Sequence, residues 1–297
     1  MNTGPADRSA GSDAVEVLRY AAFTADGVGG NPAGVVLDAH DVDAAAMLEI
    51  ATEVGFSETI FLSDRTVDAA GRTLMTTRYF SPLAEVAFCG HATVAAAVAL
   101  AERGDEGPLV FRTRVGDIEV RTTAGLSGPM ATLTSVAPYV VTPEWADVTE
   151  ALDALDWGPE DLDSNFPVRV AFAGNEHLVL VANSVARLSA LDYDVPRLTA
   201  LMDARGWTTI ALIHAVSPTE FLARNPFPVG GVFEDPATGA AAAAFGGYLR
   251  ALGLVGTPVR VLIRQGEDMG RPSRLLVDIP EGDGGIQVTG AAARMTS

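Results

Sequence analysis

Two alanine-rich segments, 90–103 and 238–252, are apolar around nearly their whole helical circumference. A helix with no polar face must be wrapped by other elements, so each segment predicts a buried central helix. Similar sequence precedes both: RYFSP at 78–82 leads to CGHAT at 89–93, and RNPFP at 224–228 leads to EDPATG at 234–239. We therefore predict an α+β fold of two pseudo-symmetric halves, each a curled, mostly antiparallel, barrel-like sheet around one central helix.

The rest of the hydrophobic pattern supplies the elements around these helices. Apolar patterning predicts strands beginning at 15 and at 58–62, 73–80, 109–114, 118–123, 168–173, 177–182, 209–216, 259–264 and 274–279. Helical spacing predicts helices at 41–54, capped by Asp41 and ended by Gly55, and at 195–205. We divide the chain into a flexible tail at 1–14, an N-terminal half at 15–128 and a C-terminal half at 129–297, whose last strand could return to the N-terminal half.

The composition excludes several classes of site. All 20 basic residues are arginine, so the chain has neither the lysine of a Walker phosphate loop nor the Schiff-base lysine of a pyridoxal phosphate enzyme. The single cysteine excludes an intrachain disulfide and any multi-cysteine zinc or iron–sulfur site. The four histidines stand far apart and form no ligand pair, so we predict no metal.

The charge and the hydropathy limit the partners. A net charge of −18 repels nucleic acid and anionic membranes, so neither is an expected partner. The first residues lack the apolar core of a signal peptide, and the longest apolar stretch, about ten residues, is well short of the ~20 that cross a bilayer. We therefore predict a soluble, cytoplasmic protein.

The starts of the two buried helices are candidate binding sites. A helix start offers unpaired backbone N–H groups and positive dipole potential, which suit a carboxylate. The missing side chains of Gly90 and Gly239 would let an anion approach this backbone closely. If the two halves face each other, both starts meet in one cleft, and the expected partner is a small-molecule carboxylate substrate.

Five polar side chains near these starts are candidates for the chemistry. Glu58 lies among apolar strand residues, where burial would raise its pKa toward that of a proton shuttle; the alternatives are a surface strand glutamate and one satisfied by a neighbouring hydroxyl. His91 could donate a hydrogen bond or shuttle a proton, or bond only locally. Asp235 could orient an amine, act as a second acid/base, or cap the following turn. Cys89 is a thiolate base or a small buried hydrophobe, and Asn31 binds a ligand or shapes a turn.

Five short motifs occur in one order along most of the chain: GNPAG at 30–34, GFSET at 55–59, CGHAT at 89–93, EDPATG at 234–239, and RQG with MGRPS at 264–273. Together they resemble the PhzF-like family, relatives of the phenazine-biosynthesis isomerase with the diaminopimelate epimerase-like fold. The duplicated halves inferred above agree with that fold.

The resemblance implies a cofactor-independent isomerase of antibiotic biosynthesis, acting as a homodimer and similar to the enzyme for trans-2,3-dihydro-3-hydroxyanthranilate. It implies that Glu58 moves a proton within a small unsaturated amino or hydroxy acid, assisted by His91 and Asp235. The substrate-binding positions would then be Asn31, Gly90, Gly239 and Ala240.

Two departures from the family pattern leave alternatives open. Ala240 stands where the family usually has serine, and one missing hydroxyl contact changes specificity by about 1–3 kcal/mol. Related racemases use two opposed cysteines; here the position opposed to Cys89 is predicted to be Asp235, which excludes two-thiol racemisation. The open alternatives are an amino-acid epimerase that uses Cys89 with Glu58, and a non-catalytic relative that binds small acids.

Overall fold

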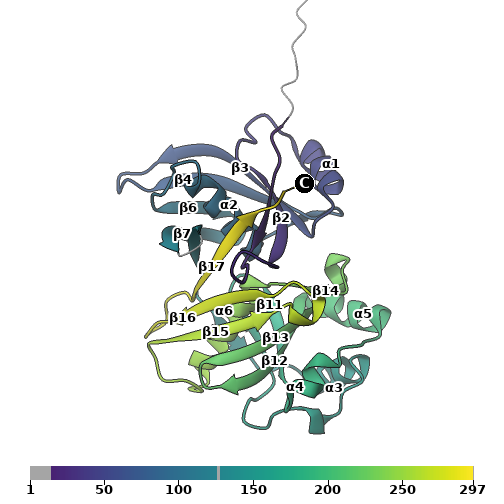
Figure 1. The fold of residues 1–297 in the computed structure, drawn as a ribbon. Helices are drawn as coiled ribbons and strands as arrows, with labels where there is room; N and C mark the ends of the chain where they lie inside the picture. Colours follow the sequence, from purple (N-terminus) through teal and green to yellow (C-terminus); the bar gives the residue numbers. More distant parts are fainter. Residues whose placement is uncertain (1–14, 126–127, 297) are drawn as a thin grey trace, which may run out of the picture.

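The computed structural model describes residues 15–125 and 128–296, which form two halves joined end to end (Figure 1). The elements of the first half are β1 (Leu18–Ala22), β2 (Asn31–Val36), α1 (Ala44–Val54), β3 (Glu58–Val67), β4 (Thr73–Phe80), β5 (Glu85–Val86), α2 (Gly90–Ala101), β6 (Leu109–Thr113), β7 (Gly116–Gly125) and β8 (Gly128–Thr134). Those of the second half are β9 (Tyr139–Val141), α3 (Trp145–Ala154), β10 (Arg169–Phe172), β11 (Glu176–Val181), α4 (Val185–Ser189), α5 (Val195–Arg205), β12 (Trp207–Ser217), β13 (Glu220–Pro226), β14 (Glu234–Asp235), α6 (Gly239–Ala251), β15 (Val259–Gln265), β16 (Ser273–Ile279) and β17 (Gln287–Arg294).

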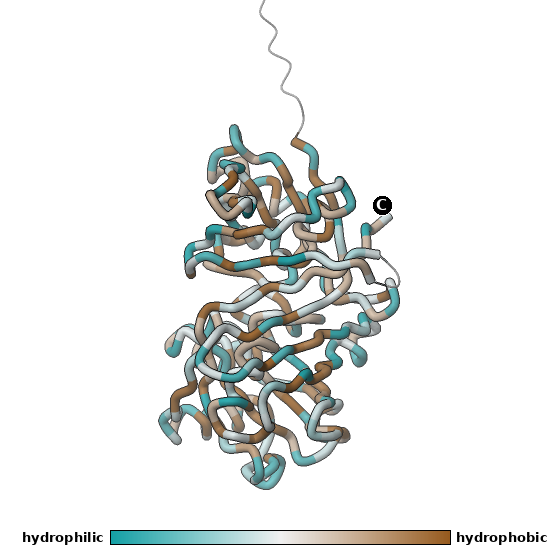
Figure 2. Tube along the Cα trace, turned by 90° about the vertical axis from the view of Figure 1, so that its left-hand side faces the viewer, coloured by the Kyte–Doolittle hydropathy of each residue, from teal (hydrophilic) through white to brown (hydrophobic). Residues whose placement is uncertain are grey.

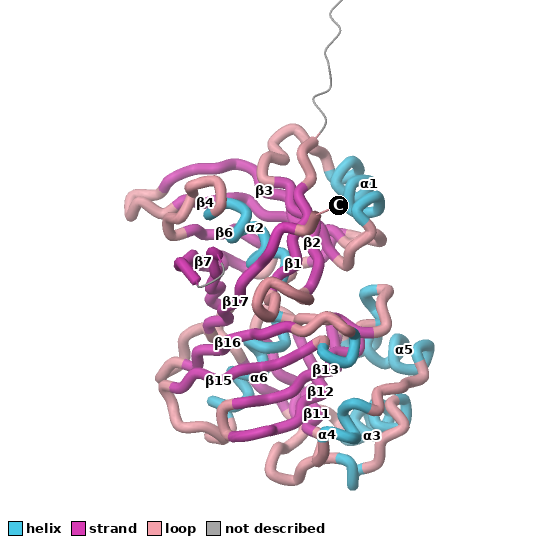
Figure 3. The backbone as a smooth tube through the Cα atoms, in the orientation of Figure 1, coloured by secondary structure: helices cyan, strands magenta, loops and turns pink. Residues whose placement is uncertain are grey.

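Each half is a sheet curled around one helix, as the sequence predicts. In the first half, β1, β2, β3, β4, β6, β7, β8 and β17 pair in that order and close on β1, so they form a barrel around α2. In the second half, strands from β9 to β17 curl around α6 in a matching order (Figure 3). Two strand pairs in each half are parallel. They are β2–β3 and β4–β6 in the first half, and β11–β12 and β13–β15 in the second; the other pairs are antiparallel. The predicted fold class is therefore confirmed.

The two central helices are buried along almost their whole length. Every residue of α2 is buried, and so is α6 from Gly239 to Leu249. Hydrophobic stretches run through the interior of both halves, and hydrophilic ones concentrate in the loops (Figure 2). Small side chains let the strands approach closely: a Cβ on Gly246 would lie 2.8 Å from Ile286 Cγ2. Alanine and glycine are thus required at these helix positions by contact with the surrounding strands.

The peripheral elements agree with the sequence except in detail. Helix α1 is capped by Asp43, whose carboxylate accepts the Ala46 N–H at 2.9 Å, and not by the predicted Asp41. Gly55 ends it in the left-handed conformation at φ 72°, as predicted. The β6–β7 hairpin closes between Thr113 and Gly116, slightly earlier than predicted. The sequence analysis missed α3, α4, β8, β13 and the short strands β5, β9 and β14, and it gave no bounds for β2 or β17.

Strand β17 joins the two halves at their junction. β17 pairs with β16 of its own half and also with β8 and β1 of the other. The hydroxyls of Thr132 and Thr289 meet at 2.7 Å on the β8–β17 pair. The predicted tail, 1–14, lies outside the described residues, and so does part of the predicted boundary, at 126–127. The division of the chain into two halves between residues 128 and 129 stays a prediction. In the structure, β8 begins at Gly128.

No helix in the described ranges is both long and apolar enough to cross a membrane.

Candidate active site

Three of the predicted residues meet where β3 and α2 begin. Glu58 is the first residue of β3, Cys89 directly precedes α2, and His91 lies in the first turn of α2. The His91 Nε2 atom lies 3.4 Å from Glu58 Oε2, and its Nδ1 atom lies 3.3 Å from Cys89 Sγ. Glu58 is 6% exposed, and its Oε2 atom is buried without a hydrogen-bond partner. The surface alternative for Glu58 is therefore wrong, and its carboxylate has an unused acceptor.

Asn31 connects this cluster to the second half. It is the first residue of β2 and not part of a turn. Its Nδ2 atom lies 2.6 Å from Asp235 Oδ1, 3.0 Å from the Ala237 carbonyl and 3.0 Å from His91 Nδ1. An amide nitrogen has two hydrogens, which Asp235 and Ala237 accept. Asn31 thus ties the start of α2 to the segment that leads into α6.

A second network fixes Asp235 on β14. Its Oδ2 atom accepts the Thr238 hydroxyl at 2.6 Å. Gln265 donates to the Asp235 carbonyl at 2.7 Å and to the Thr238 hydroxyl at 3.0 Å, and it accepts the Thr238 N–H at 3.1 Å. The sequence analysis missed Thr238 and Gln265, because their role depends on contacts between distant segments.

Burial controls the protonation of the cluster. It is the largest of the effects that raise the pKa of Asp235 to about 7, and the nearby Glu58 carboxylate adds to it. Burial lowers the pKa of His91, against the opposing effect of Glu58. Burial and Glu58 both raise the pKa of Cys89 well above that of a free thiol. Near neutral pH, His91 and Cys89 are therefore uncharged, and Asp235 is close to its midpoint.

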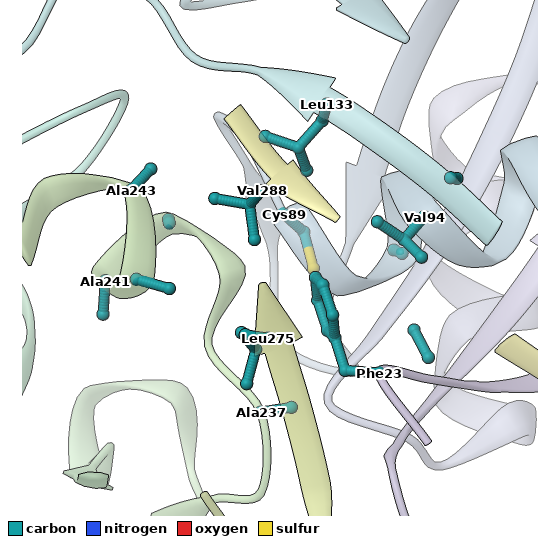
Figure 4. Packing of buried hydrophobic residues seen from close by; sticks show 14 of the residues in the cluster. Phe23, Cys89, Val94, Leu133, Ala237, Ala241, Ala243, Leu275 and Val288 are labelled. Carbon is teal, nitrogen blue, oxygen red and sulfur yellow. The ribbon is translucent and has the colours of Figure 1, made fainter. Parts of the chain in front are cut away.

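The two helix starts abut directly. A Cβ on Gly90 would lie 3.1 Å from both Gly239 Cα and the Ala240 nitrogen, and a Cβ on Gly239 would lie 3.1 Å from the ring of Phe23. Figure 4 shows Phe23, Cys89 and Ala237 together in the core cluster that spans both halves. The glycines thus permit close contact between α2 and α6, while their contact with an anion stays a prediction.

A cavity of about 410 Å³ opens beside Glu58, between the two halves. Aromatic side chains from both halves line it, among them Phe88, Trp207 and Phe227. Its charged lining residues within the described part of the chain are Glu58 and Asp203, and none is basic. A carboxylate entering it would depend on backbone N–H groups for its counter-charge. A larger cavity of about 660 Å³ lies elsewhere, against β15 and β16, and touches none of the predicted site residues.

The internal repeat shows which positions correspond in the two halves. The two repeated motifs begin with Arg78 and Arg224. Arg78 pairs with Phe61 of β3, and Arg224 pairs with Leu212 of β12. Three residues earlier on these strands stand Glu58 and Thr209, which are therefore equivalent. The second half has no carboxylate where the first half has Glu58.

The same comparison bears on the position opposed to Cys89. Cys89 directly precedes Gly90, and Thr238 directly precedes Gly239, so Thr238 is the equivalent of Cys89 in the repeat. Asp235 lies close enough to the thiol for its charge to raise the thiol pKa, and its place as the opposed residue stays a prediction. Asp235 ends β14, as Val86 ends the equivalent β5. A second thiol is absent at either position, so the exclusion of two-thiol racemisation still holds.

The same cluster is also a possible set of metal ligands. Donor atoms of Glu58, Cys89 and His91 lie within 4.8 Å of one another. Spacing along the sequence could not reveal this set, because β3 brings the glutamate from another segment. The predicted absence of a metal therefore stays a prediction.

Comparisons with known proteins agree with one another. Residues 20–297 match the family model PhzC-PhzF, phenazine biosynthesis-like protein. The uncharacterized isomerase YfhB of Bacillus subtilis is 32% identical over 289 residues, covering 93% of this chain and 95% of the relative. The trans-2,3-dihydro-3-hydroxyanthranilate isomerase of Pseudomonas chlororaphis is 32% identical over 262 residues, covering 85% and 86%.

Solved structures share the fold over nearly the whole length. A PhzF-family phenazine biosynthesis protein of Bacillus anthracis superposes with a TM-score of 0.81 at 25% identity, covering 94% of this chain and 96% of that one. A hydroxyproline epimerase of Agrobacterium vitis superposes with a TM-score of 0.63 at 14% identity, covering 94% and 90%, which shows likeness of fold alone.

Proposed function

The chain belongs to the PhzC-PhzF family of phenazine biosynthesis-like proteins and is an isomerase, and on this premise we propose that Glu58 is its general acid/base. The observation that carries the proposal is the buried, unpartnered Glu58 Oε2 atom in a residue that lines the cavity between the halves. A carboxylate there can accept a proton without first breaking a hydrogen bond.

The reaction is a proton shift within the substrate skeleton. The Glu58 carboxylate takes a proton from an sp³ carbon of a small unsaturated amino or hydroxy acid, and the electron pair of that C–H bond enters the conjugated system. The proton on Glu58 exchanges with solvent through the adjoining cavity, and Glu58 then delivers a proton to another carbon of that system, so the product is an isomer and no cofactor is consumed.

The surrounding groups bind the substrate. Its carboxylate is received by the backbone N–H groups at Gly90, Gly239 and Ala240, which suit an anion at a helix start. These three residues abut one another and do not line the cavity beside Glu58, so this contact requires the two halves to separate at the helix starts. Asp235 receives a substrate amine or hydroxyl, and its pKa of about 7 lets it accept or donate a hydrogen bond near neutral pH. His91 lies 3.4 Å from Glu58 Oε2 and assists the proton transfer.

The first substrate to test is trans-2,3-dihydro-3-hydroxyanthranilate, which the name of the Pseudomonas chlororaphis relative specifies. Ala240 replaces the serine that the family usually has at this predicted binding position, so the hydroxyl of that serine is missing here. The next substrates to test are therefore small acids that lack the group with which this hydroxyl would form a hydrogen bond. Cytoplasmic location, homodimerisation and a part in antibiotic biosynthesis rest on the same family membership and belong to this proposal.

One observation favours a second candidate activity, amino-acid epimerisation with Cys89 and Glu58 as the two bases. Cys89 Sγ lies 3.3 Å from His91 Nδ1, within the same cluster as the carboxylate. The raised pKa of this thiol weighs against it, because the thiolate is the reactive form.

Proton NMR in D₂O distinguishes the two candidates. We expect the wild-type protein to convert the substrate with deuterium in the product, Glu58→Gln to lose this conversion, and Glu53→Gln, at an exposed position of α1, to keep it. Conversion that survives Glu58→Gln would refute the proposed base. Inversion at one stereocentre without a shift of a double bond, lost in both Cys89→Ser and Glu58→Gln, would establish the epimerase. If the first substrate is not converted, the same readout is applied to a panel of small amino and hydroxy acids.

A further inference from the structure

We propose that Glu58, Cys89 and His91 form a binding site for a thiophilic divalent cation such as Zn²⁺, and that the bound cation inhibits the isomerase. The inhibition rests on the proposed function of Glu58, whereas the binding does not. All three residues are at least nine-tenths buried, and their donor atoms come from two elements, β3 and the start of α2.

The distance between His91 and Glu58 fits a tetrahedral ion. With Zn–N and Zn–O bonds near 2.0–2.2 Å and a Zn–S bond near 2.3 Å, a tetrahedron has N···O edges of about 3.3 Å and N···S edges of about 3.6 Å. His91 Nε2 lies 3.4 Å from Glu58 Oε2, so these two ligand atoms are in place. Cys89 Sγ lies beside the ring, 3.3 Å from Nδ1 and 3.7 Å from Nε2, so the thiolate reaches the third vertex by rotation of its side chain about the Cα–Cβ bond.

Hydrogen bonding around His91 leaves the correct nitrogen available. Both amide hydrogens of Asn31 are accepted elsewhere, by Asp235 and Ala237, so His91 Nδ1 can carry the ring proton. The nearby Pro32 carbonyl favours a protonated ring nitrogen. This tautomer places the lone pair of Nε2 beside Glu58 Oε2, at 3.4 Å, and the Ser57 hydroxyl, at 3.5 Å. The Oε2 atom of Glu58 has no hydrogen-bond partner. Two opposed acceptors 3.4 Å apart are stabilised by a cation between them.

The ion can reach the site through a cavity, and its coordination by Glu58 would inhibit the isomerase. Glu58 lines the cavity of about 410 Å³, through which an ion and its remaining water ligand can enter. Binding displaces the Cys89 proton to solvent, and the thiolate, the neutral imidazole and the carboxylate then share one ion. A coordinated Glu58 carboxylate can no longer take a proton from carbon.

Co²⁺ is the probe that tests the binding. We expect the full chain, freed of metal with a chelator and kept reduced, to bind one Co²⁺ with a thiolate-to-cobalt absorption band that Zn²⁺ removes. Cys89→Ser should abolish the band and weaken binding more than about tenfold, and Glu58→Gln should weaken it while keeping the band. His40→Gln, at an exposed histidine, is the matched control and should behave as wild type.

Each result decides the proposal. Absence of the band in wild type, its persistence in Cys89→Ser, or its loss in His40→Gln would overturn the site. Far-ultraviolet circular dichroism identifies a Cys89 variant that fails to fold, and Cys89→Ala then replaces it. For the inhibition, stoichiometric Zn²⁺ should stop deuterium incorporation by the metal-free enzyme, and a chelator should restore it. Turnover that is unchanged at saturating Zn²⁺ would refute the inhibition alone, whereas a metal-free enzyme without turnover would refute the proposed function alone.

Discussion

Replacing Asp235 by asparagine should change how the stability of the protein depends on pH. Asp235 is 3% exposed, and its pKa is raised from 3.8 to about 7, first by burial and then by the charge of Glu58. The folded protein thus holds a proton on Asp235 over a pH range in which the unfolded chain has lost it. Asparagine keeps the shape of the side chain and does not titrate.

The sign and the size follow from this difference. Below pH 3.8 the carboxyl is protonated in both states, and above pH 7 it is ionised in both, so the group adds no slope there. Between these values the folded state binds more protons, so the free energy of unfolding falls as the pH rises. From pH 5 to pH 8 the loss spans two pKa units, about 2.7 kcal/mol at 1.36 kcal/mol per unit. Asp235→Asn has no such titration, so between pH 5 and pH 8 its free energy of unfolding should rise relative to that of wild type by about the same amount.

Urea unfolding of both proteins at pH 5 and pH 8 measures this double difference. Groups that titrate in both proteins cancel, which isolates Asp235. Asp283→Asn, at an exposed loop position, is the control and should show little difference. In a Glu58→Gln background the improvement should shrink, because the second cause of the shift is gone. A double difference near zero, or one of opposite sign, would refute the raised pKa of the buried Asp235 carboxyl.

Two further substitutions test the packing of the halves, each by urea unfolding. Gly90→Ala should lower the free energy of unfolding by about 1–3 kcal/mol, because its Cβ would press on the start of α6, whereas Gly107→Ala, with nothing within 4 Å, should change it little. Arg224→Met should cost about 3–5 kcal/mol, because it leaves Glu234 buried and unpaired, whereas Arg260→Met breaks an exposed pair and should cost less than about 1 kcal/mol. Equal costs within either pair would contradict the packing described.

The sequence predicted the core of the fold well because the core depends on local pattern. A helix that is apolar on all sides must be buried by surrounding elements, so the sequence predicted both α2 and α6, together with most of the strands around them. β13 was missed because Arg224 and Asn225 interrupt its apolar pattern, and only its partners make them buried. The pairing of β17 with β1 joins residues at opposite ends of the chain, and no local pattern reports such a contact.

The candidate site was predicted residue by residue, while its connections were not. The motifs named Asn31, Glu58, His91 and Asp235, and the structure brings all four into one buried network. Gln265 was quoted only as part of a motif, although it fixes the Asp235 segment through three hydrogen bonds. Its role requires β15 to end beside β14, a consequence of the curled sheet that the sequence alone does not contain.

The repeat explains why a single carboxylate can serve as the base in a symmetric frame. Equivalent positions hold Glu58 and Thr209 on the strands, and His91 and Ala240 in the helices. One half therefore supplies the carboxylate and its imidazole neighbour, and the other presents small or hydroxyl side chains at the same places. A symmetric pair of bases suits inversion at one carbon, where a proton leaves one face and arrives at the other. A single base beside a conjugated substrate suits transfer between two carbons on the same face, which is the proton shift proposed here.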